Sequence, residues 1–268
     1  MHKCKTFYIL FLFSLVHFYF YLALLFILIV PNKNNMRVIF YKKYLTFMDS
    51  IFYLSGLKAK IKDVKVEKVE KVKIDGWRNL IILNHCSAIL DNLVLAHFLR
   101  QNNFDWNNLR TVSRISKKKP SQNKILSFFD SLLVTKNLKH DQAILAKTLA
   151  KWHNTNLPLN IVLFPEGVTF SPGTHKKYGK NYKNVLAPKS GLFQLLIKGM
   201  RFKHVYSIDI LYKLKNRRLS GDKDILFHMA DPDFTIVVQL HKTDITKINE
   251  EWIYSEWIRK DKWITESI

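Results

Sequence analysis

The sequence contains 268 residues with a mass of 31.7 kDa, which suits one sizeable domain. Only two cysteines are present, Cys4 and Cys86, so the disulfide framework of a small secreted protein is excluded. The 43 basic and 21 acidic residues give a net charge of +22, which favours anionic partners. Nucleic acid is disfavoured among them, because the sequence has no zinc-finger spacing, RNA-binding aromatic signature or basic zipper.

The chain starts with an apolar segment, residues 7–30, that contains no Lys, Arg, Asp or Glu. A helix of roughly 20 such residues crosses the core of a bilayer. A signal peptide usually has an apolar region of about 7 to 15 residues that ends at small residues, whereas this segment continues into PNKNNMR. We therefore expect a retained anchor within residues 1–35. The basic residues that follow it favour a cytosolic C-terminal domain.

Residues 36–60 mix aromatic residues and lysines without a clear period. This composition is typical of a segment that lies in the membrane interface with its rings at head-group depth. A second membrane span is the alternative, but Lys42, Lys43 and Asp49 argue against it. Next to a membrane anchor, the basic chain is expected to have anionic lipid head groups as its nearest partners.

Residues 61–268 are expected to form one α/β domain, a single layered domain with a mixed, largely parallel sheet flanked by helices. Val64, Val66, Val69, Val72 and Ile74 alternate with charged residues in the manner of half-exposed strands. Short apolar strands then alternate with helical stretches. The predicted strands are 80–83, 109–113, 132–135, 160–164, 204–212 and 234–240, and the predicted helices are 89–101, 121–130, 141–153 and 191–199.

His85 and Asp91 follow the predicted strand 80–83 closely. Ligands of α/β sheets meet the chain at the carboxyl ends of strands, where an imidazole oriented by a carboxylate can act as a general base. The simpler interpretation is a structural His that ends the strand and an Asp that begins the next helix. A nucleophilic Cys86 is a further alternative, but consecutive side chains in extended structure point apart, and no second His is indicated as its partner.

A second polar cluster follows the predicted strand 160–164, where Pro165, Glu166 and Gly167 end the apolar run. Glycine at such a turn allows backbone amides to approach a ligand closely. On its own this turn would be interpreted as loop structure, but it gains weight from the His85 cluster that precedes it.

Together the two clusters resemble the PlsC-like glycerolipid acyltransferases, which acylate lysophosphatidic acid and other lysophospholipids. The family signature is a strand that ends in Asn-His, then four residues and an Asp, and later Phe-Pro-Glu-Gly. The matching residues here are Asn84, His85, Ser87 and Asp91, followed by Phe164, Pro165, Glu166 and Gly167.

Further segments follow the family order over roughly residues 60 to 265. Lys136 stands in the place of a family arginine, and Lys189 stands before a glycine-led helix. The tail, EWIYSEWIRKDKWI, is similar to the ending of the branch that contains lysocardiolipin and lysophosphatidylinositol acyltransferases. Two positions depart from the pattern: five residues separate His85 from Asp91, and Thr169 replaces a basic residue that often follows the glycine.

The resemblance implies a mechanism without a cofactor, in which acyl-CoA is a co-substrate. His85 would take the proton of a lysophospholipid hydroxyl, which attacks the thioester, while Asp91 holds the imidazole. Lys136, Lys189 and the turn at Gly167 are the candidates for binding the acceptor's phosphate. Glu166 is expected to order that turn, since its charge would repel a phosphate.

The sequence thus predicts a membrane-anchored acyltransferase that uses acyl-CoA, on the cytosolic face of the endoplasmic reticulum, with a role in phospholipid synthesis or remodelling. The alternative is a catalytically inactive, lipid-binding membrane-surface protein of the same fold. Glycerol 3-phosphate, a thiol or an amine stays open as acceptor. The basic runs 114–119, 176–183 and 213–218 are candidates for contacts with coenzyme A phosphates or the bilayer surface.

Overall fold

The sheet and its flanking helices are formed by residues 61–268. The structure, a computed structural model, describes residues 61–63, 78–87, 90–101, 109–115, 131–135, 137–154, 159–179 and 181–268, together with single positions before residue 58. The strands are β1 (Ile61–Asp63), β2 (Asn79–Leu83), β3 (Leu109–Arg114), β4 (Leu132–Val134), β5 (Asn160–Leu163), β6 (His204–Leu214), β7 (Arg217–Arg218) and β8 (Phe234–Asp244). The helices are α3 (Leu90–Gln101), α5 (Leu138–His153), α6 (Pro172–Tyr178), α7 (Ser190–Gly199), α8 (Asp222–His228) and α9 (Trp252–Ser267), and a 3-10 turn, η3, covers Ile245–Lys247.

The strands form one mixed sheet in the order β1-β8-β6-β2-β5-β3-β4, with β7 paired to β6. β2 lies parallel to both β5 and β6, and β3 lies parallel to both β5 and β4. β8 and β7 pair with β6 in the antiparallel sense. The α/β class and the largely parallel sheet are therefore confirmed.

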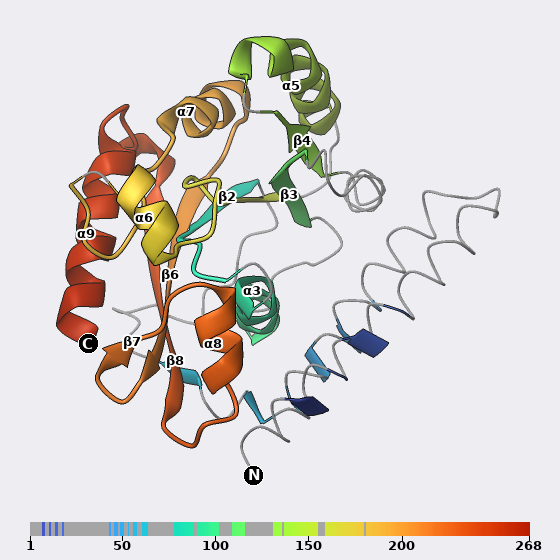
Figure 1. Ribbon diagram of the computed structural model, residues 1–268. Helices are drawn as coiled ribbons and strands as arrows, with labels where there is room; N and C mark the ends of the chain where they lie inside the picture. Colours follow the sequence, from blue (N-terminus) through green and yellow to red (C-terminus); the bar gives the residue numbers. More distant parts are fainter. Residues whose placement is uncertain are drawn as a thin grey trace.

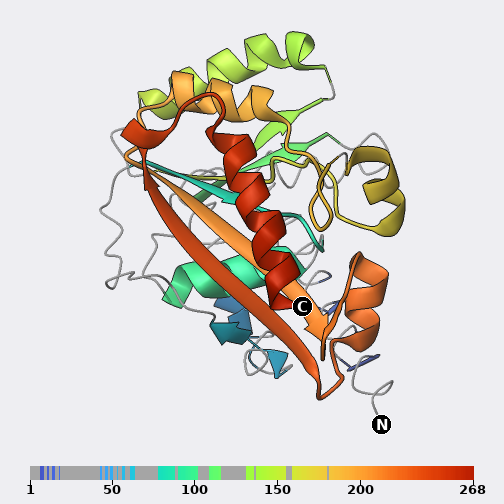
Figure 2. The ribbon, with the colours of Figure 1, turned by 90° about the vertical axis from the view of Figure 1, so that its left-hand side faces the viewer.

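Two apolar layers cover the two faces of the sheet. Because strand side chains alternate between faces, Ile81 of β2 packs with α3 and α8, whereas Ile82 packs with α5, α7 and α9. Figure 1 shows α9 on one side of the sheet and α3 and α8 on the other. Figure 2 shows α9 crossing the face formed by β6 and β8. All five residues of β2 are buried, which explains its unbroken apolar run.

Most predicted elements are found within a few residues of their expected ends. Strand 80–83 is β2, helix 89–101 is α3, helix 141–153 is α5 and helix 191–199 is α7. Strands 204–212 and 234–240 are longer than expected, because antiparallel pairing of β6 with β8 continues through polar positions to His204↔Asp244 and Leu214↔Phe234. The predicted helix 121–130 and the strands at 64–74 lie outside the described residues.

The predicted anchor, residues 7–30, falls largely outside the described residues and stays a prediction. No helix among the described residues has the length and apolar character needed to cross a membrane. Among the described positions of the segment 36–60, Leu57 is buried in the core, and Asp49 Oδ1 lies 2.8 Å from Nδ1 of His97 on α3.

Candidate active site

The two polar clusters of the sequence meet at one edge of the sheet. β2 and β5 are parallel neighbours with Asn79 opposite Asn160 and Ile82 opposite Leu163, so their carboxyl ends lie side by side. His85 follows β2, and Glu166 follows β5. The His85 backbone joins the clusters by two hydrogen bonds, since its amide donates to Glu166 Oε2 at 3.1 Å and its carbonyl accepts the Phe170 amide at 2.6 Å.

His85 and Asp91 form a close pair. Nδ1 of the imidazole lies 2.8 Å from Oδ2 of the carboxylate, although five residues separate the two positions. Asp91 is fully buried, whereas the His85 side chain retains 17% of its exposure. A carboxylate at Nδ1 leaves Nε2 on the open side of the ring, which is the nitrogen that can accept a proton from a substrate.

The start of α3 explains how Asp91 reaches the histidine. Ser87 Oγ accepts the Leu90 amide at 3.1 Å, and Asp91 Oδ2 accepts the amides of Ser87 at 2.9 Å and Cys86 at 2.8 Å. This reciprocal arrangement resembles a capping box with one additional residue. Residues 88 and 89, between Ser87 and the start of α3, lie outside the described residues.

Burial and charge act in opposite directions on His85. Burial alone would lower the pKa of its imidazole, but the hydrogen bond and charge of Asp91, together with the charges of Glu166 and Asp222, outweigh burial. The pKa of His85 is therefore raised above 6.5. Thr169, which replaces the expected basic residue, places Oγ1 3.3 Å from His85 Nε2. A hydroxyl thus occupies the position next to the reactive nitrogen.

Glu166 lies inside the protein, where its carboxylate accepts three hydrogen bonds. Its Oε1 accepts the Leu186 amide and the Trp257 indole, each at 3.3 Å, while Oε2 accepts the His85 amide. Burial raises the pKa of Glu166 to about 7, against the opposing effect of these donors. Glu166 therefore connects the turn after β5 to the end of β2 and to α9, as expected of a residue that orders the turn.

The turn at Gly167 has a conformation that requires glycine. Its φ is +69°, and its amide closes the turn on the Phe164 carbonyl at 3.0 Å. Lys189 covers the turn, since its amide donates to the Pro165 carbonyl at 2.9 Å and its Nζ lies 3.0 Å from where a Gly167 Cβ would be. The structure therefore brings Lys189 to the motif, where we predicted a phosphate contact.

Asn84 and Cys86 are buried and contact the neighbouring strand β6. The Asn84 amide pairs with the Ile210 backbone in both directions, at 2.7 and 2.8 Å, and so continues the β2–β6 contact past the strand end. Cys86 is buried, and burial raises its thiol pKa to about 12. A thiol in this state is a poor nucleophile, so the structure argues against the alternative of a cysteine enzyme.

The family comparison agrees with this geometry. A family model described as acyltransferase matches residues 63–211, more than half of the sequence. The chain belongs to the acyltransferase family. The matched region includes both motifs and ends just before Tyr212 of β6. No curated protein matches the chain.

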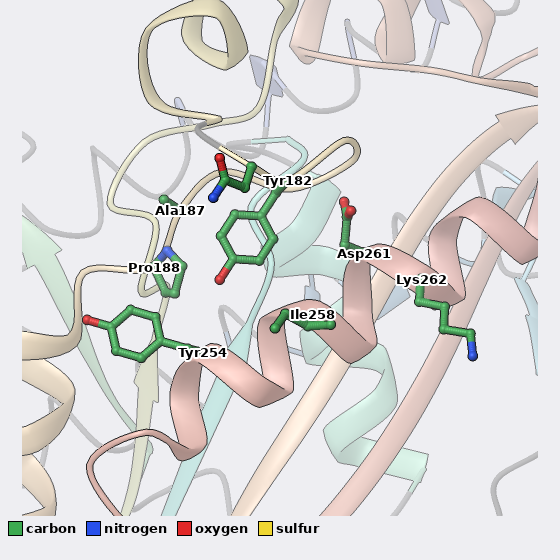
Figure 3. A pocket seen from close by; sticks show the side chains of 8 residues that line it. Tyr182, Ala187, Pro188, Tyr254, Ile258, Asp261 and Lys262 are labelled. Carbon is green, nitrogen blue, oxygen red and sulfur yellow. The ribbon is translucent and has the colours of Figure 1, made fainter.

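Lys136 lies outside the described residues, so its role in this acyltransferase stays a prediction. A separate cavity of about 440 Å³ lies between the loop before α7 and α9, with Tyr182, Tyr254 and Ile258 among its lining residues (Figure 3). None of the predicted site residues lines it.

Three residues beyond the family match add to the site. Sequence reasoning missed Tyr212 and Asp222, and it named Arg218 only as a member of the basic run 213–218. Tyr212 donates its hydroxyl to Asp91 Oδ1 at 2.9 Å. Asp222, at the start of α8, accepts the Ser87 hydroxyl at 2.6 Å. Arg218 places its guanidinium 3.9 Å from the centre of the Phe170 ring. No local pattern marks Tyr212 or Asp222 or distinguishes Arg218 within its run, because the antiparallel part of the sheet brings these residues to the site.

Proposed function

We propose that this acyltransferase moves a fatty acyl chain from acyl-CoA to the free hydroxyl of a lysophospholipid, lysophosphatidic acid or a related lipid. The observation that carries the proposal is the 2.8 Å contact of His85 Nδ1 with buried Asp91. The family match supports acyl transfer in general, and the apolar residues 7–30 and the net charge of +22 support a lipid acceptor at a membrane surface.

In the proposed reaction, Nε2 of His85 takes the proton of the acceptor hydroxyl as its oxygen attacks the thioester carbonyl. Asp91 holds the ring with Nε2 toward the substrate and stabilises the imidazolium that forms. The new ester forms as the C–S bond breaks, and the imidazolium then gives its proton to the coenzyme A thiolate. The balanced products are the acylated lipid and free coenzyme A.

We further propose a role in phospholipid synthesis or remodelling at the endoplasmic reticulum, with the catalytic domain in the cytosol. The basic residues that follow the apolar segment support this orientation. The lysocardiolipin and lysophosphatidylinositol branch is the nearest candidate for the acceptor class, because the tail of the chain is similar to that branch.

The test is release of free coenzyme A by the purified, detergent-solubilised protein with acyl-CoA and a panel of lysophospholipids. We expect turnover with at least one acceptor and none after His85→Ala, with membrane association unchanged in the variant. Turnover at the wild-type rate in His85→Ala would remove the proposed base. An inactive wild-type protein that still binds vesicles would favour the lipid-binding alternative.

A further inference from the structure

A cation from outside the matched family region lies next to the catalytic pair. Arg218 of β7 stacks its guanidinium on the ring of Phe170, the residue after Thr169. Its Nη2 lies 3.8 Å from Sγ of Cys86, the residue after His85. Nε2 of His85 lies beside Thr169 Oγ1. Arg218 therefore contacts the residue that follows His85 and the residue that follows Thr169.

The hydrogen-bonding capacity of this guanidinium is largely unused. Its Nε is buried and has no partner, and its other two contacts are long, 3.5 Å to Asn184 Oδ1 and 3.8 Å to the Cys86 sulfur. Among the described residues, no carboxylate lies within 4.0 Å of it. By contrast, Nη2 of Arg259 makes two carboxylate contacts of 2.6 Å.

A partly buried guanidinium with unpaired donors lowers the stability of the fold, and a bound anion that accepts hydrogen bonds from these donors would remove this cost. Buried polar groups in native proteins nearly always have partners, and the planar fork of an arginine matches the oxygens of a phosphate. Stacking on an aromatic ring fixes the orientation of the fork without using its donors.

The surrounding charges indicate why a phosphate would need this cation. Asp91, Glu166 and Asp222 all lie close enough to His85 for their charges to raise the pKa of its imidazole. A substrate that carries a phosphate would be repelled by these carboxylates as it approaches the histidine. Lys189 covers one side of the site at Gly167, and Arg218 lies on the side formed by Phe170 and Cys86.

We propose that Arg218 binds a phosphate group of a substrate during acyl transfer. This inference rests on the proposed function, since both substrates of that reaction carry phosphate. The phosphate belongs either to the head group of the lysophospholipid or to coenzyme A, and the two sources share the same chemistry of recognition.

Arg217, which belongs to the same basic run 213–218, offers a matched control because the structure pairs it with a carboxylate. Its guanidinium pairs with Asp224 at 3.3 Å and its side chain is 55% exposed. Arg217→Gln and Arg218→Gln remove the same charge from neighbouring positions. A general effect of net charge would therefore appear in both variants, whereas loss of a phosphate site would appear only in Arg218→Gln.

The experiment measures KM for lysophosphatidic acid, KM for acyl-CoA and the thermal midpoint of the full-length protein and both variants. We expect Arg218→Gln to raise one KM by roughly ten- to a hundredfold, and Arg217→Gln to change each by less than about twofold. A rise in the lysophosphatidic acid KM assigns the phosphate to the acceptor, and a rise in the acyl-CoA KM assigns it to the donor. Equal KM values in the two variants would overturn the proposal, as would an equal loss of kcat/KM for both substrates together with a lower midpoint.

Arg218→Lys serves as a second variant if Arg218→Gln does not fold. The lysine keeps the charge but lacks the paired donors of the guanidinium, so the KM that Arg218→Gln raises should rise by a smaller factor. An unchanged KM would contradict the proposal. Stabilisation of the protein by inorganic phosphate gives a readout without turnover, and we expect it to be weaker in Arg218→Lys than in the wild type. An inactive wild-type protein would contradict the proposed function, but stabilisation by inorganic phosphate would still test the phosphate site.

Discussion

The geometry of Asp91 is set by four donors, three on Oδ2 and one on Oδ1. The Oδ2 donors come from His85, Cys86 and Ser87, which are close in sequence, whereas the Oδ1 donor is the hydroxyl of Tyr212 on β6. A carboxylate held at both oxygens has one orientation, and the imidazole follows it. Tyr212 is therefore a positioning residue that acts on His85 through Asp91.

Tyr212→Phe tests this arrangement. The ring should keep its stacking on Phe234, at 6.3 Å between centroids, but Asp91 Oδ1 loses its donor, at a cost of about 1–3 kcal/mol. We expect kcat to fall by roughly tenfold with an unchanged KM for acyl-CoA. Tyr206→Phe, at a buried position of the same strand, is the control. Equal kcat values in the two variants would show that the hydroxyl of Tyr212 does not position the pair.

The raised pKa of His85 predicts the pH dependence of the reaction. A general base must be neutral, so kcat/KM should fall as the pH drops through the pKa of the imidazole. Because Asp91 raises that pKa despite burial, the acid limb should lie above pH 6.5. Asp91→Asn keeps the burial but removes the charge, so its acid limb should move to lower pH while kcat falls by roughly 10²- to 10⁴-fold. A limb at the same pH in both proteins would mean that another group is being titrated.

At the scale of elements, α9 is attached to the sheet by buried charges as well as by apolar residues. Lys260 is fully buried, and its Nζ donates to Asp209 Oδ1 and, at 3.1 Å, to the Ile208 carbonyl of β6. Arg259 binds the other oxygen of Asp209 at 2.6 Å. The Trp257 indole of α9 also donates to Glu166. This helix therefore holds a residue of the candidate site in place.

Lys260→Met should destabilise the domain. The substitution leaves Asp209 Oδ1 and the Ile208 carbonyl buried without their donor, and breaking a buried pair in this way costs about 3–5 kcal/mol. The thermal midpoint should fall by about 10 °C. Lys262→Met is the matched control, because Lys262 is 75% exposed and pairs loosely with Glu266 at 3.8 Å. Equal midpoints for both variants would contradict a structural role for the buried pair.

Local patterns predicted the parallel strands and their helices well, because β2 and β5 are continuous apolar runs that stop at polar residues. They did not predict α9 as a helix. Its buried positions follow a helical period, but Lys260 interrupts the apolar stripe with a charge whose partner lies on β6. The same reason applies to Tyr212 and Arg218, whose contacts depend on the order β8-β6-β2 and not on any neighbour in sequence.

The motif residues of the site were predictable because the carboxyl ends of parallel neighbours meet at one sheet edge. His85 and Glu166 needed only the two strands before them, and the spacing problem at Asp91 was solved by capping bonds within one turn of chain. The surroundings of these residues were not predictable. That Glu166 faces α9 and that a hydroxyl lies beside His85 Nε2 follow from tertiary packing.

For the whole molecule, two different forces can hold the protein at a membrane. The net charge of +22 attracts anionic lipid, and this attraction is screened when the Debye length shrinks to about 3 Å at 1 M salt. Insertion of residues 7–30 is insensitive to salt, because it rests on burial of apolar side chains in the bilayer. Extraction at high salt therefore distinguishes attachment by charge from attachment by insertion.

We expect the full-length protein to stay in the membrane pellet after extraction with 1 M salt and then with alkaline carbonate, which also removes charge from lysines. The double variant Leu24→Arg and Leu25→Arg places two charges in the apolar segment, each at a cost of at most about 2.5–3.5 kcal/mol, the figure for the centre of a span. It should be released at high salt, while Leu24→Ala with Leu25→Ala, the uncharged control, should remain in the pellet. Release of the wild-type protein by salt alone would show that charge holds it at the surface, and the predicted anchor would be wrong.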